Sequence, residues 1–441
     1  GDESGEAKRQ ADGLRGKHSF SPEYVKYPPP PENLKLLHAS IFLRHGDRTP
    51  ISRSVGTAIN AEEDRDFWAS LLPEKEAQRW WDTVSPVVPE SVSSEPYDLG
   101  NTPFGQLTER GAMECRQFGA HIRERYIERL GLLPREDPNL QDIKIRTTNL
   151  RRTQQTAQNF LEGLYPVATR NPNDHTIPIS TCPLGEETLI PNAKTCPKCM
   201  RMMQRAAKEA LGEQIVIKGE REIMRNLGYP PKQVKWAQAR EVMTCYLLQG
   251  KPLPNNLTEH DIDRLGDING FIWGAQYGDQ DIARLSVGRI MAEVVDDMAS
   301  AMDDPDDSYK IAMYAGHDST LVPILSALGV YDNKWPSYAA NIVFELAEEV
   351  KTGEMYVRVL YNNEEMLLMD QFWNDFDEFY NYMAYYVTSD KEYYEECQEP
   401  DLLEEYEARL LAAARGEPYQ PAPSGTFICG EGWFSHRTTT I

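Results

Sequence analysis

Apolar and polar positions along this chain predict short buried strands that alternate with amphipathic helices. Residues 36–43 and 309–315 are largely apolar runs of strand length, and residues 142–146 alternate apolar and polar side chains. Residues 341–348 and 355–361 have the same strand character and are predicted to form a hairpin at a sheet edge. Strands separated by helical segments are typical of an α/β fold.

Helical spacing dominates the middle of the chain. The region 166–304 has little strand character and is predicted to form an α-helical cap, inserted into an α/β core of residues 33–165 and 305–373. Residues 1–32 are predicted to form a polar N-terminal arm, and residues 374–441 an acidic extension of helices and loops. The helical patterns within the cap lie at residues 202–213, 220–227, 236–248 and 282–302.

The seven residues from Arg44 to Pro50, Arg-His-Gly-Asp-Arg-Thr-Pro, directly follow the first predicted strand. Ligands of open α/β sheets bind at the carboxyl ends of the strands. The guanidinium groups of Arg44 and Arg48 suit phosphate oxygens, and His45 between them offers a nucleophile. A lone basic cluster is usually a solvated turn. The order of residues here, with Gly46 and Pro50 shaping the loop, favours phosphoryl transfer to or from histidine.

A second motif, Gly316-His317-Asp318, follows the strand predicted at residues 309–315. A helix is expected to begin here, with Asp318 as its cap and its N-terminus directed at a bound phosphate. His317 and Asp318 can also be interpreted as purely structural, with the histidine packed and the aspartate capping the helix. This interpretation is compatible with a role in binding phosphate.

Together the two motifs resemble the signature of the histidine acid phosphatases. The resemblance implies a central mixed β-sheet flanked by helices, with an inserted α-helical cap. It implies that His45 attacks phosphorus and becomes phosphohistidine, while Arg44 and Arg48 hold the phosphate oxygens. It also implies that Asp318 protonates the leaving alkoxide and that His317 donates to a phosphate oxygen.

The same family places a further phosphate-binding arginine at the end of a strand, in a sequence that Arg146-Thr147-Thr148 resembles. Arg146 is therefore the predicted third arginine. Arg151 and Arg152, in the first turn of the next predicted helix, either touch the substrate or are solvated. Because the arginines supply the positive charge that phosphoryl transfer needs, no metal and no cofactor are expected.

Residues 317–336 and 189–192 look most similar to the lysophosphatidic acid phosphatase branch of that family. Lysophosphatidate or a similar lipid phosphate is therefore the first substrate expectation. A broad-specificity acid phosphatase or phytase is the alternative, and a phosphate-binding pseudoenzyme scaffold is a further one. A mutase or phosphotransferase of the superfamily is disfavoured by both motifs. Trp68, Trp80 and Trp81 either line a lipid-accepting groove or pack in the core.

Charge and length exclude some classes of partner. The formal net charge of −23 over 441 residues disfavours nucleic acid, whose binding relies on basic surface. No apolar run approaches the roughly 20 residues of a membrane-spanning helix, so no transmembrane segment is expected. The expected partner is a small-molecule phosphate monoester. The oligomeric state is left open.

Seven cysteines fit an oxidising compartment. Cys397 and Cys429 bracket a segment rich in Pro, Gly and Glu, which a disulfide between them would close. Cys196-x-x-Cys199 lacks a second pair and is a weak zinc candidate. A secreted or endomembrane-lumen protein is expected, and a mitochondrial or cytoplasmic one is the alternative. Because the chain begins at Gly1 without a signal-like stretch, targeting information is expected to be missing from it.

Overall fold

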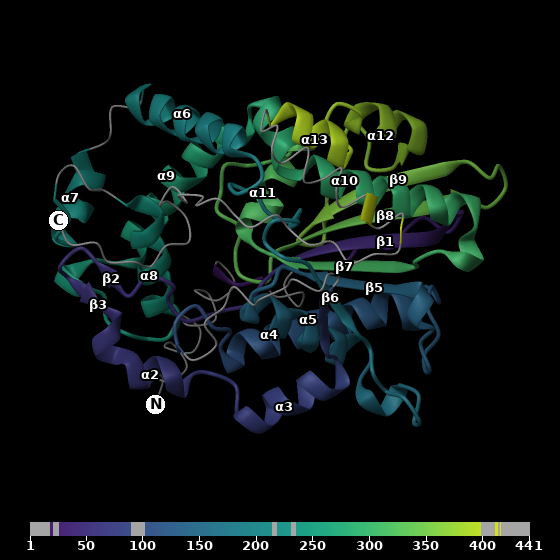
Figure 1. Cartoon of the computed structure of the whole chain (residues 1–441), viewed down its shortest axis with the longest axis horizontal. Helices are drawn as coiled ribbons and strands as arrows, with labels where there is room; N and C mark the ends of the chain where they lie inside the picture. The colour runs from purple at the N-terminus through teal and green to yellow at the C-terminus, as the bar shows by residue number, and fades with distance from the viewer. Residues whose placement is uncertain are drawn as a thin grey trace.

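The computed structural model describes residues 18–20, 26–89, 102–213, 218–230, 235–397, 411–412 and 415. Within this part of the chain, nine strands form one mixed sheet with helices on both faces (Figure 1), which confirms the predicted α/β fold. The strand order is β10-β9-β8-β1-β7-β5-β6-β4, and β11 pairs with β9. The strands are β1 (Leu34–Arg44), β4 (Val87–Pro89), β5 (Ile143–Thr147), β6 (Ile179–Thr181), β7 (Ile311–Gly316), β8 (Asn341–Glu349), β9 (Met355–Tyr361), β10 (Glu364–Glu365) and β11 (Asn374–Asp375).

The two halves of the sheet differ in strand direction. Strands β1, β7, β5, β6 and β4 run parallel to one another, whereas β8 pairs antiparallel with β1 and β9, and β10 and β11 pair antiparallel with β9. The parallel half brings the carboxyl ends of its strands to one edge of the sheet. Arg44 at the end of β1 lies opposite Gly316 at the end of β7, and Thr147 of β5 lies opposite Ala315. Segments far apart in sequence therefore meet where both predicted motifs begin.

Helices cover each face of β1, which is why this strand is apolar on both sides. On one face Phe42 stacks on Tyr314 of β7, with ring centroids 4.8 Å apart, in a core shared with α10 and α11. On the other face Ile41 lies in a core with Phe118 of α4 and Phe160 of α5. The helices flanking the sheet are α3 (Lys75–Val84), α4 (Glu109–Ile122), α5 (Arg151–Leu164), α10 (Gln280–Asp303), α11 (Asp318–Ala327), α12 (Phe376–Met383) and α13 (Asp390–Glu396).

The remaining helices stand beside the sheet edge, on the left of Figure 1. Four of them, α2, α7, α8 and α9, share a second core, in which Trp68 of α2 packs with Val242 of α8, Leu265 of α9 and Leu227, the residue directly after α7. Within the predicted cap of residues 166–304, β6 instead joins the sheet and α10 packs on it. The helices of this group are α2 (Arg65–Ser70), α6 (Pro197–Glu213), α7 (Lys218–Asn226), α8 (Trp236–Leu248) and α9 (Glu259–Tyr277), and the hairpin of β2 (Ser54–Val55) and β3 (Ile59–Asn60) lies with them.

The C-terminal extension is attached to the rest of the protein by a disulfide that the sequence did not predict. Cys397, at the end of α13, bonds to Cys196, 201 residues earlier. The expected Cys397–Cys429 pairing is therefore wrong, and Cys429 itself lies outside the described residues. Cys199 is a buried thiol whose Sγ lies 3.7 Å from the Ser286 hydroxyl. The Cys-x-x-Cys pair is thus divided between a disulfide and a packed thiol.

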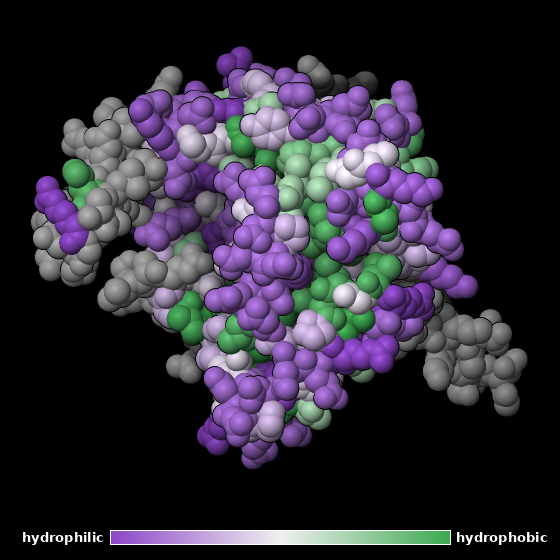
Figure 2. Space-filling model, turned by 90° about the vertical axis from the view of Figure 1, so that its right-hand side faces the viewer, coloured by the Kyte–Doolittle hydropathy of each residue, from purple (hydrophilic) through white to green (hydrophobic). Residues whose placement is uncertain are grey.

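One face of the molecule shows the hydrophilic surface that the net charge of −23 leads us to expect. The face opposite the cap is mostly hydrophilic, with scattered apolar areas (Figure 2). Across the described residues, no helix combines the length and apolar character needed to cross a membrane. Trp68 and Trp81 are almost fully buried, which favours the core interpretation for both, whereas Trp80 is 41% exposed.

Candidate active site

The loop after β1 holds His45 in a defined orientation. His45 is 2% exposed, and its Nδ1 lies 2.9 Å from the carbonyl oxygen of Gly46. Because a carbonyl only accepts, Nδ1 carries the proton and Nε2 keeps the lone pair. The loop packs tightly on the start of α4: a Cβ on Gly46 would lie 2.5 Å from the Gly111 carbonyl oxygen. Only glycine fits there, and the result is an imidazole with one nitrogen ready to act as a nucleophile.

His317 lies beside His45, at the end of the neighbouring strand β7. The two rings meet edge to face with centroids 5.5 Å apart. The Nε2 of His317 lies 2.9 Å from the hydroxyl of Thr148, which follows β5. The backbone N–H of His317 donates to the Thr320 hydroxyl at 2.9 Å, within the first turn of α11. The ends of three parallel strands thus fix the two imidazoles.

Both loop arginines are paired with carboxylates. Arg44 donates to Asp318 at 2.9 Å and to the Pro336 carbonyl at 2.5 Å. Arg48 donates to Glu241 of α8 at 2.5 Å. The ring of Tyr338 lies under both guanidinium groups, 4.6 Å from that of Arg44 and 5.9 Å from that of Arg48. The two cations are therefore held at fixed positions near His45.

Asp318 begins α11 and is hydrogen-bonded to Arg44 of this cluster. Its Oδ2 accepts from Arg44 and, at 3.1 Å, from the indole N–H of Trp335. Its Oδ1 accepts from the backbone N–H of Ser319 at 2.9 Å. Trp335 in turn stacks on Trp273 of α9, with centroids 4.4 Å apart. A carboxyl group thus lies at the helix N-terminus, held between a core arginine and a tryptophan.

Burial and positive charge keep both imidazoles neutral. Burial lowers the pKa of His45 well below 6.5, and the charges of Arg152, Arg44 and Arg48 lower it further. Burial and the same three arginines lower the pKa of His317 in the same way. A neutral imidazole is the form with nucleophilic character, so the cluster keeps it available at mildly acidic pH.

The structure brings together five of the six predicted residues and places Arg146 elsewhere. Arg146 donates to Glu293 of α10 at 3.0 Å and forms an ion pair with Glu187 at 3.3 Å. It pairs in register with Tyr314, whose hydroxyl also reaches Glu293, at 3.2 Å. The alternation of β5 therefore turns Arg146 toward α10, away from the strand ends where the histidines lie.

Arg152, rather than Arg146, is the arginine whose charge acts on the two histidines. It lies in the first turn of α5 and is the largest charged influence on both His45 and His317. Arg151 was expected either to touch the substrate or to be solvated. It pairs with Asp82 at 3.3 Å, and its side chain is 31% exposed. In the sequence, Arg152 could be recognised only by its place in the first turn of a helix that follows the end of a strand.

A pocket connects this cluster to the cap. The core contributes Arg44, Arg48 and Asp318 to its wall, while α8 contributes Arg240, Glu241 and Thr244. His18 and residues 335–338 complete the lining. Neither Glu241 nor Tyr338 could be identified from the sequence, because their place in the pocket depends on how distant segments pack together. The wall therefore contains a further cation, Arg240, and a further anion, Glu241. It also contains the aromatic rings of Trp335 and Tyr338.

Comparison with known proteins finds relatives among the acid phosphatases and phytases. Human lysophosphatidic acid phosphatase type 6 is 26% identical over 397 residues, covering 84% of this chain and 88% of that protein. Bovine prostatic acid phosphatase is 27% identical over 291 residues, covering 62% of this chain and 73% of that protein. The solved Hafnia alvei phytase shares the fold, with a TM-score of 0.54 at 18% identity, and covers 81% of this chain and 98% of that chain.

The match to a family extends through the whole parallel half of the sheet and beyond. It covers residues 35–362 and is to the histidine phosphatase superfamily, branch 2. Both end-of-strand motifs, the two histidines and Asp318 lie inside the matched residues. The chain belongs to branch 2 of the histidine phosphatase superfamily and is a phosphatase.

Proposed function

We propose that this phosphatase hydrolyses phosphate monoesters through a phosphohistidine on His45. The observation that carries the proposal is the orientation of His45, whose Nδ1 is bound to the Gly46 carbonyl while Nε2 keeps its lone pair near three arginines. The Nε2 lone pair attacks phosphorus, an N–P bond forms, and the P–O ester bond breaks. Asp318 gives its proton to the departing alkoxide, which leaves as the alcohol.

The second half of the cycle returns the enzyme to its starting state. Asp318, now ionised, takes a proton from water as the water oxygen attacks phosphorus. The N–P bond breaks, inorganic phosphate is released, and His45 regains its lone pair. Donors fixed before the reaction stabilise charge on the phosphoryl oxygens in both steps.

Arg44, Arg48 and Arg152 are the proposed donors to the phosphoryl oxygens. In this structure Arg44 donates to Asp318 and Arg48 to Glu241, so a phosphate dianion would compete for donors that are already oriented. The Nε2 of His317 is hydrogen-bonded to the Thr148 hydroxyl at 2.9 Å. When a phosphoryl group is bound, this nitrogen would donate a hydrogen bond to a further phosphoryl oxygen. Arg146 has no place in this scheme.

We further propose a lipid monophosphate such as lysophosphatidate as the leading substrate. The relative named lysophosphatidic acid phosphatase supports this choice, as does the aromatic wall of Trp335 and Tyr338. Glu241 beside Arg48 would repel a second phosphate group. A broad-specificity acid phosphatase or phytase is the alternative, but a highly phosphorylated substrate needs several cations, and the pocket wall adds only Arg240 to the two loop arginines.

Phosphate release separates these substrates. Lysophosphatidate, phytate, a nucleotide, a phosphoprotein and an aromatic phosphate are compared at mildly acidic pH, with His45→Ala beside the wild type. We expect the highest kcat/KM for lysophosphatidate and loss of all activity in the variant. A preference for phytate would overturn the substrate proposal and leave the reaction intact. Equal activity of His45→Ala would overturn the reaction itself.

The Cys196–Cys397 disulfide supports a secreted or endomembrane-lumen location, because such bonds persist in oxidising compartments. Mitochondrial and cytoplasmic locations remain the alternatives. Fractionation of the native cells tests this, with the disulfide read by thiol labelling before and after reduction. Recovery of the protein in a reduced form from the cytosol would contradict the proposal.

A further inference from the structure

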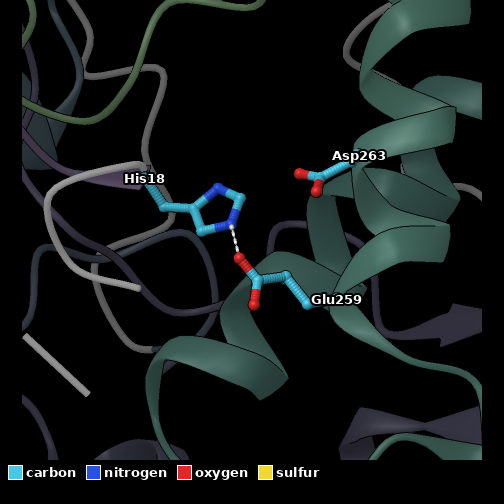
Figure 3. Close-up of side chains that lie close together, drawn as sticks. All are labelled: His18, Glu259 and Asp263. Atoms are coloured by element: carbon cyan, nitrogen blue, oxygen red, sulfur yellow. Dashed lines mark ion pairs between the residues drawn. The ribbon is translucent and has the colours of Figure 1, made fainter. Parts of the chain in front are cut away.

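His18 lines the pocket, where the N-terminal segment meets the cap. Its backbone is fixed, since the Tyr338 N–H donates to the His18 carbonyl at 2.9 Å and the Phe20 N–H donates to the Tyr338 carbonyl at 2.7 Å. The side chain is buried and faces α9 (Figure 3). An imidazole from one segment thus points at a helix from another.

Two carboxylates of α9 point back at this imidazole. Glu259 and Asp263 are four residues apart, so they share one face of the helix. Neither is needed to cap it, because Asp261 accepts from the Thr258 backbone at 2.8 Å and from its hydroxyl at 2.9 Å. Figure 3 shows both carboxylates directed toward His18. The capping box is thus formed by Asp261, and Glu259 and Asp263 lie on the side of the helix that faces His18.

The distances between these groups suit a shared ion better than a direct hydrogen bond. The Nε2 of His18 lies 3.9 Å from Oε1 of Glu259, which is beyond hydrogen-bonding range. One donor atom from each of the three residues lies within 4.8 Å of the others. Two ligands about 2.1 Å from one zinc ion are roughly 3.4 Å apart at a tetrahedral angle. Small side-chain movements would therefore bring all three atoms into coordination.

We propose that His18, Glu259 and Asp263 form a divalent-metal site that joins the N-terminal segment to the cap. One imidazole nitrogen and two carboxylate oxygens form a mixed donor set that suits Zn²⁺, with a fourth position for water. A dication balances the two carboxylates beside a neutral imidazole. The site is separate from the proposed chemistry, since none of its three residues acts on the phosphoryl group.

Zinc binding tests the site with the full chain and Zn²⁺ alone, in buffer free of phosphate and chelators. Calorimetry is expected to give one Zn²⁺ per chain. His18→Ala and the double variant Glu259→Gln/Asp263→Asn are each expected to weaken binding at least tenfold. His260→Ala is the matched control, because His260 lies on the same helix but is exposed. It is expected to bind zinc as the wild type does.

The melting temperature and the X-ray absorption spectrum show whether zinc binds at this site or elsewhere. Zinc should raise the melting temperature of the wild type and of His260→Ala, but not of His18→Ala, because a ligand stabilises only the folded state that binds it. X-ray absorption should show nitrogen and oxygen ligands without sulfur. No stoichiometric binding, unchanged affinity in His18→Ala, or sulfur ligands from the cysteines would each overturn the proposal. Circular dichroism confirms that the variants fold.

Discussion

Arg48, on the loop after β1, donates a hydrogen bond to Glu241 of cap helix α8 at 2.5 Å. Glu241 also accepts from the backbone N–H of Ile51 at 2.8 Å, so one carboxylate fixes both the arginine and the loop that follows it. Arg48 and Glu241 are both nearly buried, which strengthens the pair relative to one in water. The cap thus sets the position of an arginine proposed to bind phosphate.

Replacing Glu241 is expected to impair the reaction. In Glu241→Ala the Arg48 guanidinium loses its fixed partner, so its donors are no longer oriented before the substrate binds. We expect kcat/KM for an aromatic phosphate to fall about tenfold or more, the order expected for losing one charged hydrogen bond. Glu124→Ala is the control, because the Glu124–Arg129 pair is exposed and neither residue lines the pocket. An unchanged kcat/KM in a folded Glu241→Ala protein would contradict this role.

Arg152 and Arg146 are expected to differ in what their loss affects. Arg152→Ala should lower kcat/KM by about 10²–10³-fold, as removal of one preorganised donor does, with little change in melting temperature. Arg146→Ala should instead destabilise the fold by about 3–5 kcal/mol, because it leaves the fully buried Glu187 without its cation.

Steady-state kinetics and urea unfolding of both variants distinguish these effects. A folded Arg146→Ala protein with strongly reduced kcat/KM, beside an active Arg152→Ala protein, would restore the role that the sequence predicted for Arg146.

The buried histidines predict that the folded state weakens in acid. Burial lowers the pKa of His38, His45 and His317 in the folded state, while unfolded histidines titrate near 6.5. Below that pH the unfolded chain binds more protons than the folded chain, so stability is present above about pH 6.5 and declines as the pH falls. The slope is up to about 1.4 kcal/mol per pH unit for each histidine.

Urea unfolding between pH 7.5 and 5 in phosphate-free buffer measures this slope. His45→Asn should reduce it, because one of the titrating groups is gone. An identical pH dependence in the variant would show that His45 has the same pKa in both states. The same lowered pKa keeps His45, the proposed nucleophile, neutral in the mildly acidic range.

The disulfide is expected to stabilise the attachment of α13. Cys397→Ser should lower the free energy of unfolding by about 2–5 kcal/mol, since the bond closes a loop between residues 201 apart. Reductant should lower the melting temperature of the wild type but leave that of the variant unchanged. A further decrease on reduction of Cys397→Ser would reveal another disulfide, with Cys429 a candidate partner.

The sequence predicted most of the sheet because its strands are buried runs of strand length with a motif at the end. The residues 36–43, 142–146 and 309–315 correspond to β1, β5 and β7 within about two residues. Where those strands run parallel and adjacent, their end motifs must meet, so the meeting of His45 with His317 followed from local signals.

Features set by packing between segments could not be predicted. Helix α9 contains Gly266, Gly270 and Gly274, which weaken its helical pattern. Gly270 is required by tertiary contact, because a Cβ there would lie 1.8 Å from the backbone carbonyl oxygen of Asn333, and Gly274 packs against the side chain of the same residue. The position of Arg146 has a similar cause, because its direction depends on how β5 sits in the sheet, which the local sequence does not reveal.

The most direct test of the central claim is to trap the phosphoryl group on His45. In Asp318→Asn the first step proceeds with an aromatic phosphate, whose leaving group needs no acid, while the second step lacks its base. The variant is mixed rapidly with 4-nitrophenyl phosphate, quenched in base and mapped by mass spectrometry. We predict a burst of one nitrophenol per chain and a single phosphohistidine at His45, both absent in His45→Ala/Asp318→Asn. A phosphoryl group on another residue, or a burst that survives loss of His45, would contradict the account.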